Sequence, residues 1–319
     1  MSAITFDGVS VRFRQASQPA LRDCSLAVAA GEFVVVLGPS GCGKTTLLKT
    51  VNRLCEPSSG RIYLNGTDIR TLRVTQLRRR MGYVIQQGGL FPHMTVAQNV
   101  AVVPRLLDWS RARQRARTEQ LLGWVQLPPR EYRHRYPAQL SGGQRQRVGI
   151  ARALAGDPGV LLMDEPFGAL DAITRRTLQQ LVRALQQQLP KTVLFVSHDV
   201  AEAFYLADRV LVLRQGQIEQ FDTPHRLLAA PNSAFVRDLI AGDGELRWLR
   251  SHAVEAAMIP PTGDLPASPT LARHDDLYRA LAQLLAAGAE RLAVLDGGER
   301  VGAIGLEQIR ALAAATQPT

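Results

Sequence analysis

An apolar run of five residues, Phe33–Leu37, leads directly into the sequence GPSGCGKTT at residues 38–46, and this junction constrains the possible fold most. A continuous run of β-branched and apolar side chains is expected of a strand that is buried on both faces of a sheet. The residues that follow, LLKTV, continue as a helix. A buried strand, a glycine-rich turn and a helix in this order indicate an α/β fold with a parallel sheet.

The turn between this strand and helix fits the pattern G-x-x-x-x-G-K-[ST]. Glycines let backbone N–H groups curl around phosphate oxygens, and the new helix directs its positive end at the same anion. The lysine of such a loop reaches the β- and γ-phosphates, and the hydroxyl after it ligates Mg²⁺. The candidate nucleotide-binding residues are Gly38, Pro39, Ser40, Gly41, Cys42, Gly43, Lys44, Thr45 and Thr46.

A second glycine-rich segment, LSGGQ at residues 140–144, precedes a long helical run. Ser141 and Gln144 have the spacing of a capping box, so one interpretation is an ordinary helix start. A capping box does not need Gly142 and Gly143, and two glycines at a helix N-terminus permit close approach of the backbone to an anion. The other interpretation is a second phosphate-binding site at these four residues.

Polar residues follow two further apolar strands predicted later in the chain. Residues 160–163 end in Asp164 and Glu165, and residues 192–196 lead to His198. An aspartate at the tip of a parallel strand beside a phosphate loop can hold Mg²⁺, and the adjacent glutamate can polarise an attacking water. His198 is then well placed to meet a γ-phosphate. The structural alternative is a pair of carboxylates that only cap the strand end.

Other local patterns outline the rest of the chain. Short strands are predicted at residues 3–6 and 9–13, and Asn65-Gly66 predicts a tight hairpin turn. Residues 89–157 are predicted to be mostly helical, and they interrupt an otherwise alternating α/β pattern.

The chain has 319 residues, which suits two domains. Its net charge of +10 is uneven: residues 240–319 carry 7 arginines against 10 acidic residues, a net of −3 that leaves +13 on the rest. The basic part fits contact with nucleic acid or with an acidic membrane surface, or a solvated arginine-rich face, and the scarcity of lysine favours the last. We expect no membrane span, no signal peptide and no metal site at the three cysteines.

Seven features stand in one order, namely Phe13, GPSGCGKT, Gln86, LSGGQ, LLMDE, GALD and His198. Together they resemble the ATP-binding subunit of an ABC transporter over residues 1–240. The resemblance implies a P-loop NTPase fold with a RecA-like core, an antiparallel β subdomain and a helical insertion at about 89–157. It also implies ATP and Mg²⁺ as cofactors and an active ATPase, since every catalytic position is filled.

The resemblance further implies roles for individual residues. Phe13 stacks on adenine, where tyrosine is more usual, and Gln86 senses the γ-phosphate. Glu165 is the general base, His198 pins the γ-phosphate and Asp171 couples two sites. In the family the LSGGQ segment acts in trans, because two copies sandwich two ATP molecules head to tail. The implied catalytic residues are Glu165, His198 and Gln86, the metal ligands are Thr45, Gln86 and Asp164, and further nucleotide-binding residues are Phe13, Ser141, Gly142, Gly143, Gln144 and Asp171.

A narrower resemblance is to importers of quaternary amines such as glycine betaine, choline, carnitine or proline betaine. It is carried by NRLCEPSSGRIYLNG, GYVIQQGGLFPHMTVAQNVAVVPRLLDW and RVGIARALAGDPGVLLMDEPFGALDAITR. It implies a permease that docks between Gln86 and His93, an external substrate-binding protein and a peripheral position on the cytoplasmic face of the inner membrane. Importers of amino acids and sugars share parts of these stretches, so another small solute stays open, and the docking segment has a packed loop as its alternative.

The C-terminal residues 245–319 change character after a proline-rich connection. The order Met-Ile-Pro, helix, RLAVLD and GERVGAIGLEQI resembles one CBS repeat, which implies a small α+β domain. A single repeat buries little surface by itself, so we expect it to pair with its copy in a homodimer. It serves either as a sensor of ionic strength or of a nucleotide, or as a dimerisation element.

Two other classes of function compete with a transport motor. An ABC ATPase that acts on nucleic acid or ribosomes is motivated by the basic part of the chain, but the single cassette, the lack of zinc-type spacing and the lack of heptads argue against it, and we expect no nucleic-acid partner. A nucleotide-regulated binding module built on the C-terminal residues would leave the catalytic set without a purpose.

Overall fold

The computed structural model describes residues 2–14, 16–86, 89–168, 170–241, 249, 252–261 and 269–316. Contacts divide the chain into two compact units, Met1–Asp222 and Thr223–Thr319. This division falls earlier in the chain than the predicted boundary between residues 240 and 245, and that boundary stays a prediction.

The centre of the first unit is a six-stranded sheet in the order β10-β9-β3-β8-β7-β6. Its strands are β3 (Phe33–Leu37), β6 (Met81–Val84), β7 (Val160–Asp164), β8 (Thr192–Val196), β9 (Arg209–Arg214) and β10 (Gln217–Asp222). All neighbouring pairs are parallel except the β9–β10 hairpin at one edge. Every residue of β3 and β8 is buried, as expected of strands covered on both faces.

A second sheet of the same unit is antiparallel, in the order β2-β1-β4-β5. It contains β1 (Ser2–Val11), β2 (Leu21–Ala29), β4 (Ser59–Leu64) and β5 (Thr67–Asp68). The prediction of two strands broken at Asp7-Gly8 is wrong, because β1 runs through this site and absorbs the irregularity as shifts in pairing register. The predicted turn is confirmed: Asn65 and Gly66 have φ of 49° and 78°, the left-handed values that a type I′ hairpin needs.

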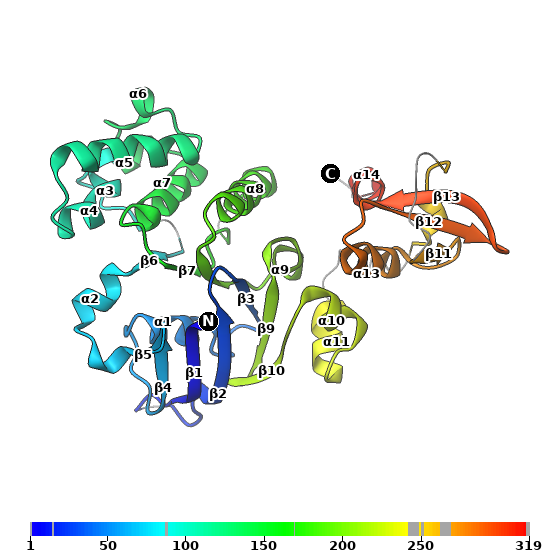
Figure 1. The fold of residues 1–319 in the computed structure, drawn as a ribbon, viewed down its shortest axis with the longest axis horizontal. Helices are drawn as coiled ribbons and strands as arrows, with labels where there is room; N and C mark the ends of the chain where they lie inside the picture. Colours follow the sequence, from blue (N-terminus) through cyan, green and yellow to red (C-terminus); the bar gives the residue numbers. More distant parts are fainter. Residues whose placement is uncertain are drawn as a thin grey trace. The chain divides into compact units, whose positions relative to one another are not determined.

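Helices surround these sheets and fill the segment between β6 and β7 (Figure 1). That segment holds α3 (Val96–Val100), α4 (Val102–Leu106), α5 (Arg111–Trp124), α6 (Pro129–Tyr132), the 3₁₀ turn η2 (Pro137–Gln139) and α7 (Gly142–Leu154). Two of these helices, α3 and α4, meet at Ala101. The others are α1 (Lys44–Val51), the 3₁₀ turn η1 (Ile69–Thr71), α2 (Val74–Arg79), α8 (Ala172–Gln188) and α9 (Val200–Leu206).

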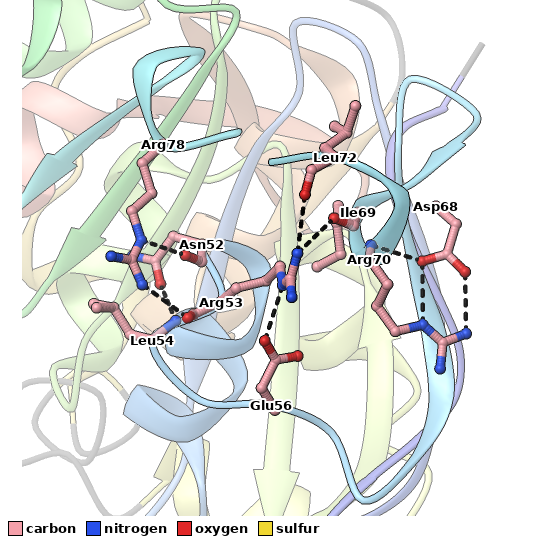
Figure 2. A network of polar contacts seen from close by, with 9 residues as sticks. All are labelled: Asn52, Arg53, Leu54, Glu56, Asp68, Ile69, Arg70, Leu72 and Arg78. Carbon is pink, nitrogen blue, oxygen red and sulfur yellow. Dashed lines mark hydrogen bonds and ion pairs between the residues drawn. The ribbon is translucent and has the colours of Figure 1, made fainter. Parts of the chain in front are cut away.

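Two arginines fasten the end of α1 to α2 and η1 (Figure 2). Arg78 on α2 donates to the carbonyl oxygens of Asn52 at 3.0 Å and Arg53 at 2.9 Å. Arg53 in turn donates to the carbonyls of Ile69 and Leu72. Carbonyl groups at a helix C-terminus lack intrahelical partners, so these guanidinium groups satisfy them and fix the helix that follows residues 38–43.

The second unit contains α10 (Pro224–Ala229), α11 (Ala234–Ala241), the 3₁₀ turn η3 (Val254–Ala256), β11 (Thr270–Ala272), α13 (Leu277–Ala287), β12 (Arg291–Asp296), β13 (Glu299–Gly305) and α14 (Leu306–Thr316). Its sheet has the order β11-β12-β13, parallel then antiparallel. The sequence did not predict β11, because three residues after a proline-rich stretch carry no readable alternation. In the part of the chain that the structure describes, no helix has the length and apolarity to cross a membrane.

Candidate functional site

The loop at residues 38–43 wraps tightly around Lys44, the first residue of α1. The Lys44 side chain is 6% exposed, and its ammonium donates to the carbonyl oxygens of Gly38 at 2.7 Å and Pro39 at 2.9 Å. Gly43 has a φ of 111°, and a Cβ there would lie 2.4 Å from the carbonyl oxygen of Ala20. Only glycine fits this position, so the packing around the loop by itself demands the residue type.

Thr45 and Asp164 come together although 119 positions separate them in the sequence. The Thr45 hydroxyl donates to Asp164 Oδ1 at 2.9 Å, where the tip of β7 meets the start of α1. Hydroxyl and carboxylate oxygens are ligands that Mg²⁺ accepts beside phosphate oxygens, so this pair fits the ion. Tyr83 on β6 approaches the same carboxyl, and burial first, with the charge of Asp164 second, raises the pKa of Tyr83 to about 12.

Glu165 and His198 lie side by side at the carboxyl ends of β7 and β8. His198 Nδ1 is 3.4 Å from Glu165 Oε2, and the His198 side chain is 61% exposed, so it is open to a ligand. The Glu165 backbone has a φ of 43°, a left-handed value that is strained for a residue with a side chain. Its N–H donates to the carbonyl of Val196 at 3.1 Å, which holds the strained residue against β8.

Gln86, two residues after the end of β6, lies close to Glu165. A Cβ added to Gly168 would lie 3.5 Å from Gln86 Nε2 and 3.6 Å from Glu165 Oε2, so both side chains extend over this glycine. The carboxyl ends of parallel strands share one edge of the sheet, and this edge gathers residues from four segments of the chain. They are Lys44, Thr45, Gln86, Asp164, Glu165 and His198.

The segment Ser141 to Gln144 begins α7 and forms the predicted capping box. The Gln144 N–H donates to Ser141 Oγ at 3.2 Å, and the Ser141 N–H donates to Gln144 Oε1 at 2.9 Å. Gly143 is buried against α8, since a Cβ would lie 2.4 Å from Thr174 Cγ2, whereas a Cβ on Gly142 would have ordinary contacts only. A side chain at residue 143 would therefore force Thr174 to move, whereas a side chain at residue 142 would not. Among the described residues, no hydrogen bond or ion pair joins this segment to residues 38–46.

The remaining predicted residues lie around these two groups. Asp171 caps α8 by accepting from the Thr174 N–H at 2.9 Å, and that hydrogen bond lowers the pKa of Asp171. Phe13 follows the end of β1 and is 49% exposed, as a stacking platform must be. Of the predicted docking segment, Gln87 and Gly88 lie outside the described residues.

Sequence reasoning missed two groups that the fold brings to this edge. Tyr83 belongs to no recognisable motif, and a tyrosine in a predicted strand is usually interpreted as a core residue. Glu202 sits on α9 behind His198, with 6% exposure, and bonds the Ser197 hydroxyl at 2.6 Å. The spacing of Asp199 and Glu202 is that of a capping box, which could have placed the helix start, but nothing in the sequence says that the glutamate is buried.

Comparison with known proteins gives one consistent result. Residues 21–168 match the family model described as ABC transporter. The chain is 44% identical to the carnitine transport ATP-binding protein OpuCA of Listeria monocytogenes over 96% of this chain and 76% of that protein. It is 45% identical to the glycine betaine uptake system ATP-binding protein YehX of Escherichia coli K12, over 92% of this chain and 94% of that protein.

Solved structures agree with this assignment. The dimeric ATP-binding cassette MJ0796, in a post-hydrolysis state with ADP and Pi, matches with a TM-score of 0.62 and 34% identity over 69% of this chain and 98% of that one. The protein cbiO1 of Clostridium perfringens, part of the ABC transporter complex cbiONQ, matches with a TM-score of 0.66 and 26% identity over 75% and 95%. The chain therefore belongs to the ABC transporter family, as one of its ATP-binding, ATP-hydrolysing subunits.

Proposed function

We propose that this chain hydrolyses ATP to power import of a quaternary-amine osmoprotectant of the glycine betaine, choline or proline type through a separate permease. The observation that carries the ATPase part is the convergence of the lysine loop, Asp164, Glu165 and His198 at one sheet edge. The substrate class is supported by several of the relatives, among them one named as a carnitine and one as a glycine betaine transport protein.

Each residue at the edge has a task in hydrolysis. The N–H groups of the loop and the Lys44 ammonium hold the β- and γ-phosphates once the lysine leaves the loop carbonyls. Thr45, Gln86 and Asp164 hold Mg²⁺, which when bound neutralises phosphate charge. Glu165 accepts the proton of the attacking water, and His198 donates a hydrogen bond to the γ-phosphate. Phe13 stacks on the adenine ring.

Two copies of the chain complete the sites. Ser141 and Gln144 have no bond to their own lysine loop among the described residues, and a helix N-terminus is a good anion site. We assign the segment Ser141, Gly142, Gly143 and Gln144 to the nucleotide of the second copy, with Asp171 beside the junction. The dimeric form of the MJ0796 cassette supports this arrangement.

The permease docks near Gln86 and His93 on the cytoplasmic face of the inner membrane, and an external binding protein delivers the solute. Phe91 supports this surface, because its large apolar side chain is 41% exposed. Buried Asn99 holds the loop by accepting from the Phe91 N–H at 2.8 Å and donating to the carbonyls of Phe91, Met94 and Thr95. The backbone that carries the apolar side chain is thus held by hydrogen bonds to a buried residue.

The C-terminal residues 245–319 form a single CBS-like repeat that pairs with its copy. The element order β11, α13, β12, β13, α14 supports this assignment. A single repeat buries Leu271, Val294 and Ile304 by itself but stays small, and pairing with a copy adds to the surface that it buries. We favour a dimerisation element over a sensor of ionic strength or of a nucleotide, because one repeat alone is present.

The ATPase rate of Glu165→Gln tests the proposal. The amide keeps the size of the side chain and cannot accept the proton, so the rate should fall by about 10²–10⁴-fold while ATP binding persists. Glu56→Gln serves as the control, since Glu56 is an exposed partner of Arg53 away from the sheet edge. A Glu165→Gln rate close to that of the control would remove Glu165 as the base. Uptake of labelled glycine betaine or of amino acids by vesicles with the permease then decides the substrate class.

A further inference from the structure

Glu202 on α9 is a buried carboxyl to which hydrolysis, as described above, gives no task. It is 6% exposed, and burial raises its pKa. A buried carboxylate is costly unless hydrogen-bond donors converge on it. The donors that face Glu202 come from two different parts of the chain, the turn that carries His198 and the helix α8.

The first contact fixes the turn between β8 and α9. The Ser197 hydroxyl donates to Glu202 Oε2 at 2.6 Å and accepts from the Asp199 N–H at 3.0 Å. The Glu202 N–H donates to Asp199 Oδ1 at 3.0 Å. The residues on both sides of His198 are therefore tied to the same glutamate, while the His198 side chain itself stays exposed.

The second contact reaches α8. Gln179 Nε2 donates to Glu202 Oε1 at 3.2 Å, and Arg175 Nε lies 4.0 Å from the same oxygen. Arg175 also donates from Nη2 to the carbonyl oxygen of Leu170 at 3.2 Å, next to Asp171. Arg175 Nε is a buried nitrogen with no hydrogen-bond partner among the described residues, so this side of the cluster is held less tightly than the serine side.

We propose that Glu202 is a positioning residue for His198, and that it links this histidine to α8, the helix that Asp171 caps. The proposal rests on the assignment of His198 to the γ-phosphate under the proposed function. Replacing the carboxyl group of Glu202 by an amide loosens the turn and moves the imidazole relative to Glu165. A displacement of the start of α8, where the second copy is assigned, reaches His198 through Arg175, Gln179 and Glu202.

Glu202→Gln is the informative change because it preserves volume. Both oxygens of Glu202 accept hydrogen bonds, whereas an amide offers one acceptor and places an NH₂ group against either Ser197 or Gln179. One donor at this buried site is then left unpaired. Leu122→Ala on α5 is the control for a general loss of stability, since Leu122 is fully buried in the helical segment and its helix does not carry any of these groups.

The first measurement is the ratio of the dissociation constants for ADP and ATP in the full chain, which reports on contacts to the γ-phosphate. Glu202→Gln should lower the preference for ATP roughly 2- to 160-fold, the range of coupling between residues that share one network. The same change in a His198→Ala background should have no further effect, and Leu122→Ala should leave the preference unchanged. An equal effect of Glu202→Gln in both backgrounds, or no effect in the wild type, overturns the proposal.

The second measurement is the imidazole NMR signal of His198 without nucleotide, identified by its loss in His198→Ala. Glu202→Gln should shift this signal and Leu122→Ala should not, and an unchanged signal in Glu202→Gln overturns the positioning role. If His198→Ala keeps the full preference for ATP while the signal still responds to residue 202, the assignment of His198 to the γ-phosphate fails and the positioning role stands.

Discussion

Substitution of Gly143 on α7 can test whether this glycine is needed for packing against α8, for nucleotide binding, or for both. A Cβ there would lie 2.4 Å from Thr174 Cγ2, whereas non-bonded carbon atoms need about 3.5–4.0 Å. Overpacking of this kind costs about 1–3 kcal/mol. Alanine returns up to about 1 kcal/mol through its helix propensity. We therefore predict that Gly143→Ala lowers the free energy of unfolding by about 1 kcal/mol.

The chain offers a matched control and a suppressor for this change. Gly123 on α5 is exposed and helical with open space around it, so Gly123→Ala should raise the free energy of unfolding by up to about 1 kcal/mol. Thr174→Ser removes the methyl group that Gly143→Ala would strike and keeps the hydroxyl. The double variant should recover most of the lost stability, measured by urea titration of the tryptophan fluorescence of the chain.

Two outcomes would refute this reasoning. If Gly143→Ala is as stable as Gly123→Ala, or if Thr174→Ser does not restore stability, the close approach of α7 and α8 is not what requires glycine. The ATPase rate of the double variant then adds a separate result. Restored stability with lost activity is the outcome expected if Gly143 also approaches the nucleotide of a second copy.

Further predictions concern the arginine network and the thiols. Arg78→Ala should lower the free energy of unfolding by about 1 kcal/mol, because two carbonyls at the end of α1 lose their donor. Arg79 is exposed on α2, the helix that also carries Arg78, and Arg79→Ala should change the free energy of unfolding by less than about 0.5 kcal/mol. Equal effects of the two substitutions would contradict the network in Figure 2. Burial raises the pKa of Cys24 to about 11, so at pH 8 only about one molecule in a thousand carries its thiolate, whereas half-buried Cys55 is more accessible. Mass spectrometry after iodoacetamide treatment should find Cys55 labelled well before Cys24, and equal rates would show that Cys24 is not shielded.

Local sequence patterns predicted the structure correctly where all the residues that determine a turn or a cap lie in one short segment. The turn at Asn65-Gly66 and the capping box at Ser141 depend on residues within four positions of one another, and both are confirmed. The lysine loop was predicted for the same reason, since strand, glycines and helix are continuous in sequence. The ends of strands were predicted less well. The strand β1 continues through Asp7-Gly8, where a break was predicted, because pairing with two neighbouring strands holds it together.

The sequence by itself determined the class of chemistry, since the order of a phosphate loop, LSGGQ, the Asp164-Glu165 pair and His198 admits few folds. Only the tertiary structure decided which residues share a site. Thr45 and Asp164 meet because parallel strands end at one edge, Gly143 faces Thr174 because α8 passes close by, and Glu202 accepts a hydrogen bond from Gln179 of α8. Each of these contacts joins residues that are distant in sequence or on separate helices, and local pattern carries no information about such distances.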